Sequence, residues 1–295
     1  SQGQHRKIST GWLSQFNDPR MTSLVREAIR KNNNLQAAAY RLKSTRESTI
    51  TSRASRLPSI NANGSTSRSY AGLGPAPGAS SDSYGLSFSA SWEIDVWGRL
   101  RDLDYATRSD YEAALADYRS AQLSLAINTA KSWVSLTESQ QQLELAGKTL
   151  VDFKKSLSLI SRRQKEALLR AVDVQLGRNN VASAERNLLN RTLQRDEAAR
   201  SLQLLLGRYP SGELQATSDL PLLRSSVPAG LPSELLRRRP DLVASRARIF
   251  SSALRADAAR KNLLPSFRLT GSSGTGSDQL RRALDPAYLT WSLAS

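Results

Sequence analysis

The sequence lacks cysteine altogether and has a single histidine, His5, in a polar stretch at the start of the chain. Without thiols, neither a disulfide framework nor a thiolate metal site can form. Zinc motifs and histidine-based catalytic triads need residues that are missing here, and no glycine-rich phosphate loop follows a buried strand. We therefore expect no metal site, no cofactor and no catalytic residues, and we do not expect an enzyme.

Long hydrophobic runs are missing as well. No stretch approaches about 18 consecutive apolar residues, so the sequence predicts no transmembrane helix. Residues 1–7 have no apolar core and do not resemble a signal peptide. If the protein is exported, we expect its targeting segment to have been removed.

The chain has far fewer acidic than basic residues. The chain has 42 Lys and Arg against 26 Asp and Glu, a formal net charge of +16. Such an excess suits an anionic partner, such as nucleic acid, a membrane surface or lipopolysaccharide. The basic residues are scattered over helical stretches, however, without a block of interleaved aromatics. Solvated, arginine-rich helix faces are the favoured interpretation.

Residues 84–96 alternate between apolar or aromatic side chains at even positions and small or polar ones at odd positions. Side chains alternate across a strand, so this pattern predicts one apolar and one polar face. The strand would run roughly 40 Å, which suits a tilted strand across an apolar band of about 25 Å. The residues predicted to face lipid are Leu86, Phe88, Ala90, Trp92, Ile94 and Val96. Those predicted to face a water-filled lumen are Ser87, Ser89, Ser91, Glu93 and Asp95.

Two pairs of residues in this stretch allow other interpretations. Glu93 and Asp95 could form a paired-carboxylate site, although water-facing residues at the rim of a barrel are the favoured interpretation. Trp92 and Trp97 suit an aromatic girdle at a membrane interface. The alternative is that both tryptophans belong to a soluble core.

Further strands are predicted on either side in the sequence. Residues 59–70 alternate in the same way, and a Gly/Pro/Ser-rich loop at 71–83 connects them to the strand from Tyr84, so that 59–97 forms a long hairpin. Residues 266–273 predict another strand, and an alternating run begins at Leu289.

Residues 99–207 contain two internal glycines and no proline, and many of their apolar residues stand in heptad phase. This is coiled-coil patterning. A helix of about 60 residues would reach roughly 90 Å, so we predict a very long antiparallel hairpin that turns near Glu166–Asp173. The alternative is a leucine-zipper dimer. The heptad residues are Leu136, Leu143, Leu150 and Leu157 on the first limb, and Val174, Val181, Leu188 and Leu202 on the second.

Shorter helices complete the prediction. Asp18-Pro19 begins a helix to about Lys31, and a second helix runs over about 35–56. After an irregular segment at 208–230, a short helix is predicted at 234–238 and a longer one at 240–262.

An internal repeat relates the two ends of the chain. Leu57-Pro58-Ser59 and Leu264-Pro265-Ser266 lie 207 residues apart, and the same offset pairs Leu24 with Leu231 and Arg41 with Arg248 without any gap. We predict a first repeat at 1–206, a linker at 207–230 and an incomplete second repeat at 231–295. On this interpretation the second copy is truncated at Ser295, before any second helical hairpin.

Several of these stretches together resemble a known family. Over nearly its whole length the chain resembles the TolC-like outer-membrane efflux proteins, and among them the OprM/NodT-type channels. The two longest motifs are the most specific to that family. The motifs lie at Trp12–Pro19, Leu57–Ile60, Ser91–Arg101, Leu204–Gly207 and Gly230–Leu242.

The resemblance implies a fold, a function and partners. The fold is mostly α with β: a long antiparallel coiled-coil hairpin plus amphipathic membrane β-hairpins. A homotrimer would combine four strands from each protomer in a β-barrel in the outer-membrane lipid, above a periplasmic helical tunnel. It would export drugs or other small molecules from an inner-membrane RND pump through a periplasmic adaptor. Such proteins are often lipoproteins anchored through an N-terminal cysteine, which this sequence lacks.

The hairpin turn is where the resemblance implies adaptor docking. Family members usually have a glycine-containing turn before a Leu-Asp pair, and Ala167 stands where glycine is expected. The residues of this tip are Glu166, Ala167, Leu168, Leu169, Arg170 and Asp173.

A second hypothesis is a soluble, basic coiled-coil protein that binds a partner such as nucleic acid. Such a protein has no use for long amphipathic strands, and this sequence predicts three of them, at 59–70, 84–97 and 266–272. We therefore favour the efflux channel, without nucleic acid as a partner.

Overall fold

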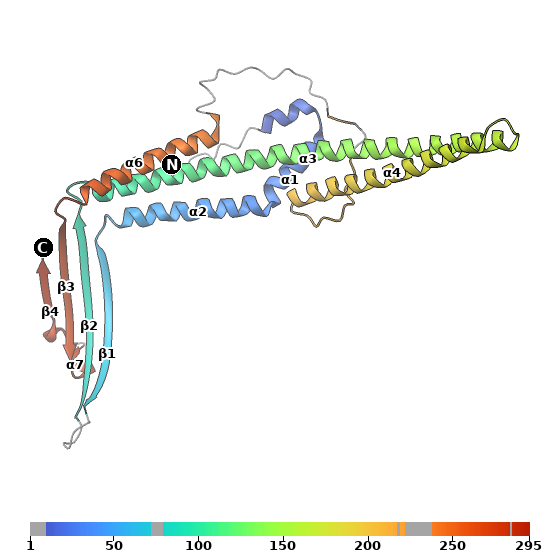
Figure 1. Cartoon of the computed structure of the whole chain (residues 1–295). Helices are drawn as coiled ribbons and strands as arrows, with labels where there is room; N and C mark the ends of the chain where they lie inside the picture. Colours follow the sequence, from blue (N-terminus) through green and yellow to red (C-terminus); the bar gives the residue numbers. More distant parts are fainter. Residues whose placement is uncertain (1–9, 72–78, 217–218, 222–237, 284) are drawn as a thin grey trace. The chain divides into compact units, whose positions relative to one another are not determined.

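The computed structural model describes residues 10–71, 79–216, 219–221, 238–283 and 285–295 (Figure 1). The chain forms two compact units, and each takes segments from both halves of the sequence. The helical unit comprises Ser1–Tyr40 and Asp117–Pro240, and the sheet unit comprises Arg41–Ala116 and Asp241–Ser295.

The helical unit begins with a 3-10 helix, η1 (Thr10–Phe16), and the helix α1 (Pro19–Lys31). Asp18 caps α1, since its Oδ1 accepts a hydrogen bond of 2.9 Å from the backbone N–H of Met21, and Pro19 occupies the first helical position. The predicted limits of this helix are confirmed.

The second helix, α2 (Asn33–Ala54), begins earlier than the sequence predicted. Only Asn32 separates it from α1. The Asn32 Oδ1 accepts from the backbone N–H of Leu35 at 3.1 Å, and its Nδ2 donates to the Leu205 carbonyl at 3.0 Å. Asn32 thus caps α2 and ties it to the end of the helical hairpin, so the run of three asparagines does not form a longer break.

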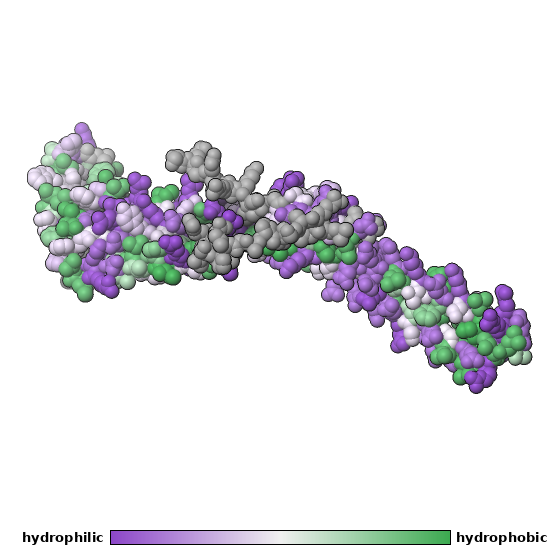
Figure 2. Space-filling view, turned by 90° about the horizontal axis from the view of Figure 1, so that it is seen from above, coloured by the Kyte–Doolittle hydropathy of each residue, from purple (hydrophilic) through white to green (hydrophobic). Residues whose placement is uncertain are grey.

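The long helices α3 (Arg99–Lys165) and α4 (Ala171–Leu205) form the predicted antiparallel hairpin, with its turn at 166–170. The heptad residues are buried or half-buried along both limbs, Leu136 and Leu202 completely. In Figure 2 the hairpin surface is largely hydrophilic in its middle and mixes hydrophobic and hydrophilic residues at its end. The coiled-coil prediction is confirmed.

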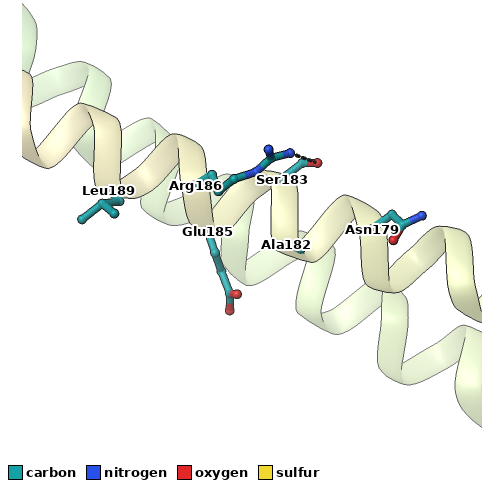
Figure 3. Close-up of a pocket in the computed structure, with 6 residues that line it drawn as sticks. All are labelled: Asn179, Ala182, Ser183, Glu185, Arg186 and Leu189. Carbon is teal, nitrogen blue, oxygen red and sulfur yellow. Dashed lines mark hydrogen bonds between the residues drawn. The ribbon is translucent and has the colours of Figure 1, made fainter.

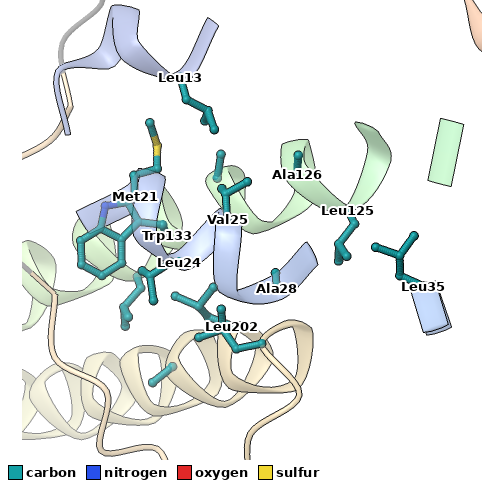
Figure 4. Packing of buried hydrophobic residues seen from close by; sticks show 14 residues of the cluster. Leu13, Met21, Leu24, Val25, Ala28, Leu35, Leu125, Ala126, Trp133 and Leu202 are labelled. Atoms are coloured by element: carbon teal, nitrogen blue, oxygen red, sulfur yellow. The ribbon is translucent and has the colours of Figure 1, made fainter. Parts of the chain in front are cut away.

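A hydrophobic core joins α1 to both limbs of the hairpin (Figure 4). Trp133 is its largest fully buried side chain, and its Nε1 donates to the Asp18 Oδ2 at 2.7 Å. One carboxylate therefore caps a helix and satisfies a buried indole. The buried core residues are Leu13, Met21, Leu24, Val25, Ala28, Leu35, Leu125, Ala126, Ala130, Trp133, Leu136, Ala199, Leu202 and Leu206.

Gly207 ends α4 with a positive φ of 68°. The Arg208 N–H donates to the Gln203 carbonyl at 2.9 Å, which is the bond of a Schellman motif. A Cβ at Gly207 would stand 2.7 Å from the Lys31 carbonyl oxygen. Only glycine allows both the left-handed turn and this close approach to α1.

Among its described residues, the sheet unit has four antiparallel strands in the order β1-β2-β3-β4. Helix α6 (Pro240–Lys261) precedes β3, a short helix α7 (Leu280–Ala283) follows it, and η2 (Pro286–Tyr288) leads into β4. The strands are β1 (Ser59–Ala71), β2 (Ala79–Ile94), β3 (Phe267–Ser277) and β4 (Thr290–Ala294).

Strand β2 differs from the prediction at both ends. It begins at Ala79, inside the expected loop, where the hairpin ladder with β1 continues to the pair Ala71–Ala79. It ends at Ile94 because Asp95 leaves the ladder to cap α3: its two oxygens accept from the N–H groups of Leu100 and Arg101 at 3.0 and 2.8 Å. The predicted extension of the strand to Val96 is wrong.

The repeat offset is visible in the element limits. Both α2 and α6 have 22 residues, and the limits of α6 are those of α2 moved by 207 positions. The predicted helix at 234–238 lies outside the described residues apart from Arg238. The division into repeats at 1–206 and 231–295 stays a prediction.

Candidate functional site

The register of the four strands separates the sheet into an apolar and a polar face. Residues paired directly across neighbouring strands lie on the same face. Phe88 pairs with Ala62 and Ser273, and Ser273 pairs with Trp291. By the same rule, the apolar face carries Ile60, Ala62, Leu86, Phe88, Ala90, Trp92, Ile94, Phe267, Leu269, Trp291 and Leu293.

This apolar face is exposed over much of its area in the single chain. Ile60 is 76% exposed, Phe88 50% and Trp291 77%. A half-buried sheet of a soluble domain normally turns such residues toward its core. An exposed apolar face of this kind marks a binding surface for another protein or for lipid.

The opposite face is made of small and polar residues. Ser87, Ser89 and Ser91 pair with Asn63, Asn61 and Ser59 of β1. Glu93 closes this face at the end of β2, where its carboxylate accepts from Arg99 at 2.5 Å and lies 3.9 Å from Arg268. Glu93 is therefore held in an ion pair, while Asp95 is a helix cap, and the two do not act as a carboxylate pair.

Of the residues predicted on the two faces, those from Leu86 to Ile94 lie on β2 as expected. Val96 and Asp95 lie beyond the strand. The Trp92 Nε1 donates to the Arg56 carbonyl at 3.0 Å, and the Trp97 Nε1 donates to the Pro265 carbonyl at 2.8 Å. Both indoles are thus tied to the ends of neighbouring elements while part of each ring stays exposed.

Ion pairs join α3 to α6 and to the turn after α2 in the sheet unit. The Asp104 side chain is completely buried and accepts from Arg56 at 3.3 Å and from Arg108 at 2.8 and 3.1 Å. Asp102 pairs with Lys261 at 2.5 Å. The sequence did not predict the pairs made by Arg56 and Lys261, because Arg56 lies 48 residues from Asp104 and Lys261 lies 159 residues from Asp102.

Asp110 and Arg255 form a further ion pair, at 2.5 Å. Together with the Asp102–Lys261 pair it joins α3 to α6. The pairing partners run in opposite directions along the two helices, so the charges specify an antiparallel register.

The predicted tip residues come together at the turn of the hairpin. Ala167 has a φ of 59°, and the Leu168 N–H donates to the Arg163 carbonyl at 2.9 Å, so α3 ends in the same motif as α4, with alanine in the glycine position. The Asp173 Oδ2 accepts from the Arg170 N–H at 3.0 Å and closes the start of α4. Leu168 is 69% exposed.

A groove of about 270 Å³ lies beside the turn, between α3 and α4. Leu157, Leu169 and Leu176 contribute apolar side chains to it. Gly177 keeps the limbs close, since a Cβ there would meet the Leu157 Cδ1 at 3.0 Å.

A second hollow lies on the outer surface of α4 (Figure 3). Arg186 donates to the Ser183 Oγ at 3.3 Å, while Leu189 is exposed to solvent. The close-up shows side chains that spread along one helix rather than converge on a point. The hollow therefore has the character of an unpartnered helix face, not of a small-molecule site.

The described parts of the chain lack the features of two other kinds of site. Those parts contain no cluster of three potential metal-ligating side chains. None of their helices combines the length and the apolar character that crossing a bilayer requires.

Residues 24–208 match the family model described as outer membrane efflux protein. The chain belongs to the outer membrane efflux protein family. The resemblance noted from the motifs and the predicted fold class are thereby confirmed. Membership assigns the protein to the bacterial outer membrane, with its helical part in the periplasm, and to a family of channels rather than enzymes.

Named relatives agree with this assignment. The toluene efflux pump outer membrane protein TtgF of Pseudomonas putida is 33% identical over 282 residues, which are 94% of this chain and 58% of the relative. The cation efflux system protein CusC of Escherichia coli is 26% identical over 96% of this chain and 62% of its own length. The chain thus spans about three fifths of the curated relatives that it matches.

Solved structures of outer membrane efflux proteins share the fold. The CusC structure superposes with a TM-score of 0.83 at 26% identity, covering 98% of this chain and 67% of the other. The open-state MtrE outer membrane channel of Neisseria gonorrhoeae gives a TM-score of 0.79 at 28% identity, covering 94% of this chain and 62% of the other.

Proposed function

We propose that the chain is the outer-membrane channel component of a tripartite efflux system, a passive conduit that exports small molecules. One observation carries the proposal: a sheet with a continuous exposed apolar face leads directly into a long helical hairpin. A soluble coiled-coil protein would not present that face to water. The relatives named as toluene and cation efflux proteins support the same assignment.

On this proposal the sheet is part of a barrel wall, with one face toward the lipid and the other toward the lumen. Leu86, Phe88, Ala90, Trp92 and Ile94 face lipid, because an exposed apolar sheet face is stabilised by contact with acyl chains or with another protein. Ser87, Ser89, Ser91 and Glu93 face the water-filled lumen. Val96 and Asp95 belong to the rim, where Asp95 starts the helical part.

The sheet supports a homotrimer. The outer edges of β1 and β4 have no neighbouring strand among the described residues, and exposed edges are normally paired or protected. Three copies of four strands would close a barrel and remove both edges. Exposed leucines on α4, among them Leu189 and Leu193, suit contacts between copies along the helical part.

The proposed partners are a periplasmic adaptor and, through it, an inner-membrane RND pump. The adaptor would dock at the tip formed by Glu166, Ala167, Leu168, Leu169, Arg170 and Asp173. Support comes from the exposure of Leu168 at the end of the hairpin, where no other described residue covers it.

The test is to express the chain with an export signal and to measure both its assembly and its conductance. We expect it in the outer-membrane fraction as a trimer that survives mild detergent, with ion conductance in planar bilayers. A monomer that stays soluble without detergent would contradict the proposal. The unrelated hypothesis of a nucleic-acid-binding protein is checked on the same material by its retention on duplex DNA.

A further inference from the structure

Positive charge is concentrated in the segment 153–180, which contains the hairpin tip and lines the groove between α3 and α4. This segment contains seven basic and only two acidic residues. The basic residues are Lys154, Lys155, Arg162, Arg163, Lys165, Arg170 and Arg178.

Few of these charges are neutralised. Asp173 serves as the cap of α4 and lies 4.0 Å from Arg170, and Lys154 pairs with Glu185. Within the described chain, no carboxylate lies within ion-pair distance of Arg162, Arg163 or Lys165, whose side chains are exposed. Three cations without a carboxylate partner therefore surround the turn, where the acidic residues are Glu166 and the capping Asp173.

The centre of this cationic surface is apolar. Leu168, Val172 and Leu176 are all largely exposed, and the adjoining groove is lined by Phe153, Leu157 and Leu169. Figure 2 shows hydrophobic and hydrophilic residues interleaved at this end of the hairpin. The arrangement is an apolar patch with a charged rim, as at protein–protein interfaces.

We propose that the tip docks the acidic end of a helical protein, in which carboxylates surround one or two apolar side chains that enter the groove. The inference rests on the proposed function, because it describes the chemistry of the partner that meets the tip. Arg162, Arg163 and Lys165 attract and orient the partner, and Leu168 with the groove supplies the desolvated contact.

An anionic membrane is the less suitable occupant. Stable binding of a helix to a lipid surface requires a broad apolar face along its length. The exposed apolar residues at this end of the hairpin are interleaved with hydrophilic ones instead, and the concave groove would not be filled by a flat bilayer. The groove, about 270 Å³ and lined by apolar side chains of α3 and α4, suits an apolar side chain of a partner helix instead.

Binding can be measured with a synthetic antiparallel helical hairpin whose turn carries four glutamates around one leucine. Its fluorescence anisotropy is followed on titration with the full chain. Matched probes carry glutamine or lysine in place of glutamate. We expect the glutamate probe to bind at least about tenfold more tightly than the glutamine probe at low salt, with the difference falling steeply at high salt.

Variants of the chain locate the site. Replacing Arg162, Arg163 and Lys165 by glutamate should reduce binding of the glutamate probe by at least about tenfold. The control is R20E/R26E/K131E, which makes the same change of net charge at exposed residues of α1 and α3 away from the tip and should leave binding unchanged. Leu168→Ser should weaken binding of both the glutamate and the glutamine probe, without changing the salt dependence.

Each contrary result has a distinct meaning. Equal binding of all three probes at the tip would overturn the acidic partner while leaving adaptor docking intact. Vesicles of phosphatidylglycerol that bind the tip in place of the hairpin probes would overturn it in favour of lipid. Equal loss of binding in the control would also overturn it, since net charge alone would then explain the attraction. The conductance of the unaltered protein tests the conduit separately.

Discussion

At the residue scale, the turn of the hairpin has an alanine at a position where glycine is usual. Ala167 has a left-handed backbone conformation in a motif that usually contains glycine, and the matching position after α4 is Gly207. A Cβ in this conformation costs about 1–2 kcal/mol. The turn therefore stores strain at the surface that we assign to docking.

Ala167→Gly should raise the free energy of unfolding by up to about 1 kcal/mol, because it removes this strain while adding some entropy to the unfolded chain. Ala182→Gly, in the exposed interior of α4, should lower it by roughly 0.5–1 kcal/mol. Urea unfolding followed by circular dichroism measures both. Equal destabilisation by the two substitutions would show that the turn is not strained.

The protonation of Glu27 should change the free energy of unfolding in a pH-dependent way. Arg208 donates to both carboxylate oxygens of Glu27, and this pairing holds the pKa of Glu27 below its usual range. Burial raises the pKa but does not outweigh the pairing, and Lys31, which donates to the same carboxylate at 3.0 Å, lowers the pKa further. The folded pKa lies below the unfolded one. The pair therefore stabilises the fold above the unfolded pKa of about 4.3, and this contribution is lost as the pH falls through the folded value.

Glu27→Gln should cost on the order of 1 kcal/mol near pH 7, since Arg208 is partly exposed and solvent screens the pair. The difference in unfolding free energy between the two proteins should shrink as the pH is lowered below about 4. Denaturation series between neutral and acidic pH provide the measurement. A difference independent of pH would mean that the substitution acts through packing.

At the element scale, a buried charge ties the turn after α2 to α3. Asp104→Asn keeps the shape of the side chain but leaves Arg56 and Arg108 without their shared carboxylate. We expect a loss of about 2 kcal/mol, below the roughly 3–5 kcal/mol of a fully buried pair because both arginines reach solvent. Asp110→Asn breaks a more exposed pair with Arg255 and should cost less than about 1 kcal/mol. Thermal unfolding of both variants compares them, and equal losses would contradict the special role of burial.

The two faces of β2 predict opposite responses at neighbouring positions. Phe88→Lys places a cation on the face assigned to lipid and should cost up to about 2–4 kcal/mol in the membrane, whereas Ser89→Lys faces the lumen and should be tolerated. The trimer fraction in outer membranes, read from mild-detergent gels, measures the effect. Normal assembly of Phe88→Lys together with failure of Ser89→Lys would reverse the assignment of the faces.

Periodicity in the sequence predicted where most helices and strands lie. It did not predict which side chains cap the ends of these elements. The alternation of residues 84–94 and the heptads of α3 and α4 report local geometry, so both were confirmed. Asp95 continues the alternation yet acts as a helix cap, and Asn32 joins two helices instead of breaking them. The Asp104 cluster was beyond reach, because Arg56 is distant in sequence and only folding brings it to the carboxylate.

At the scale of the whole molecule, the proposed trimer would pair the two sheet edges that have no neighbouring strand among the described residues. If three protomers close the barrel, β1 of one protomer lies beside β4 of the next. Because the sequence has no cysteine, introduced cysteines report this contact without background. We expect a chain with Asn61→Cys on β1 and Ser292→Cys on β4, or the neighbouring same-face positions Asn63 and Thr290, to form covalent dimers and trimers on oxidation. Each single-cysteine variant should give no covalent trimer, because one thiol per protomer cannot link all three protomers.

Cross-links that form only within one chain would mean that β1 and β4 of the same protomer pair with each other. The proposed trimeric barrel would then be wrong.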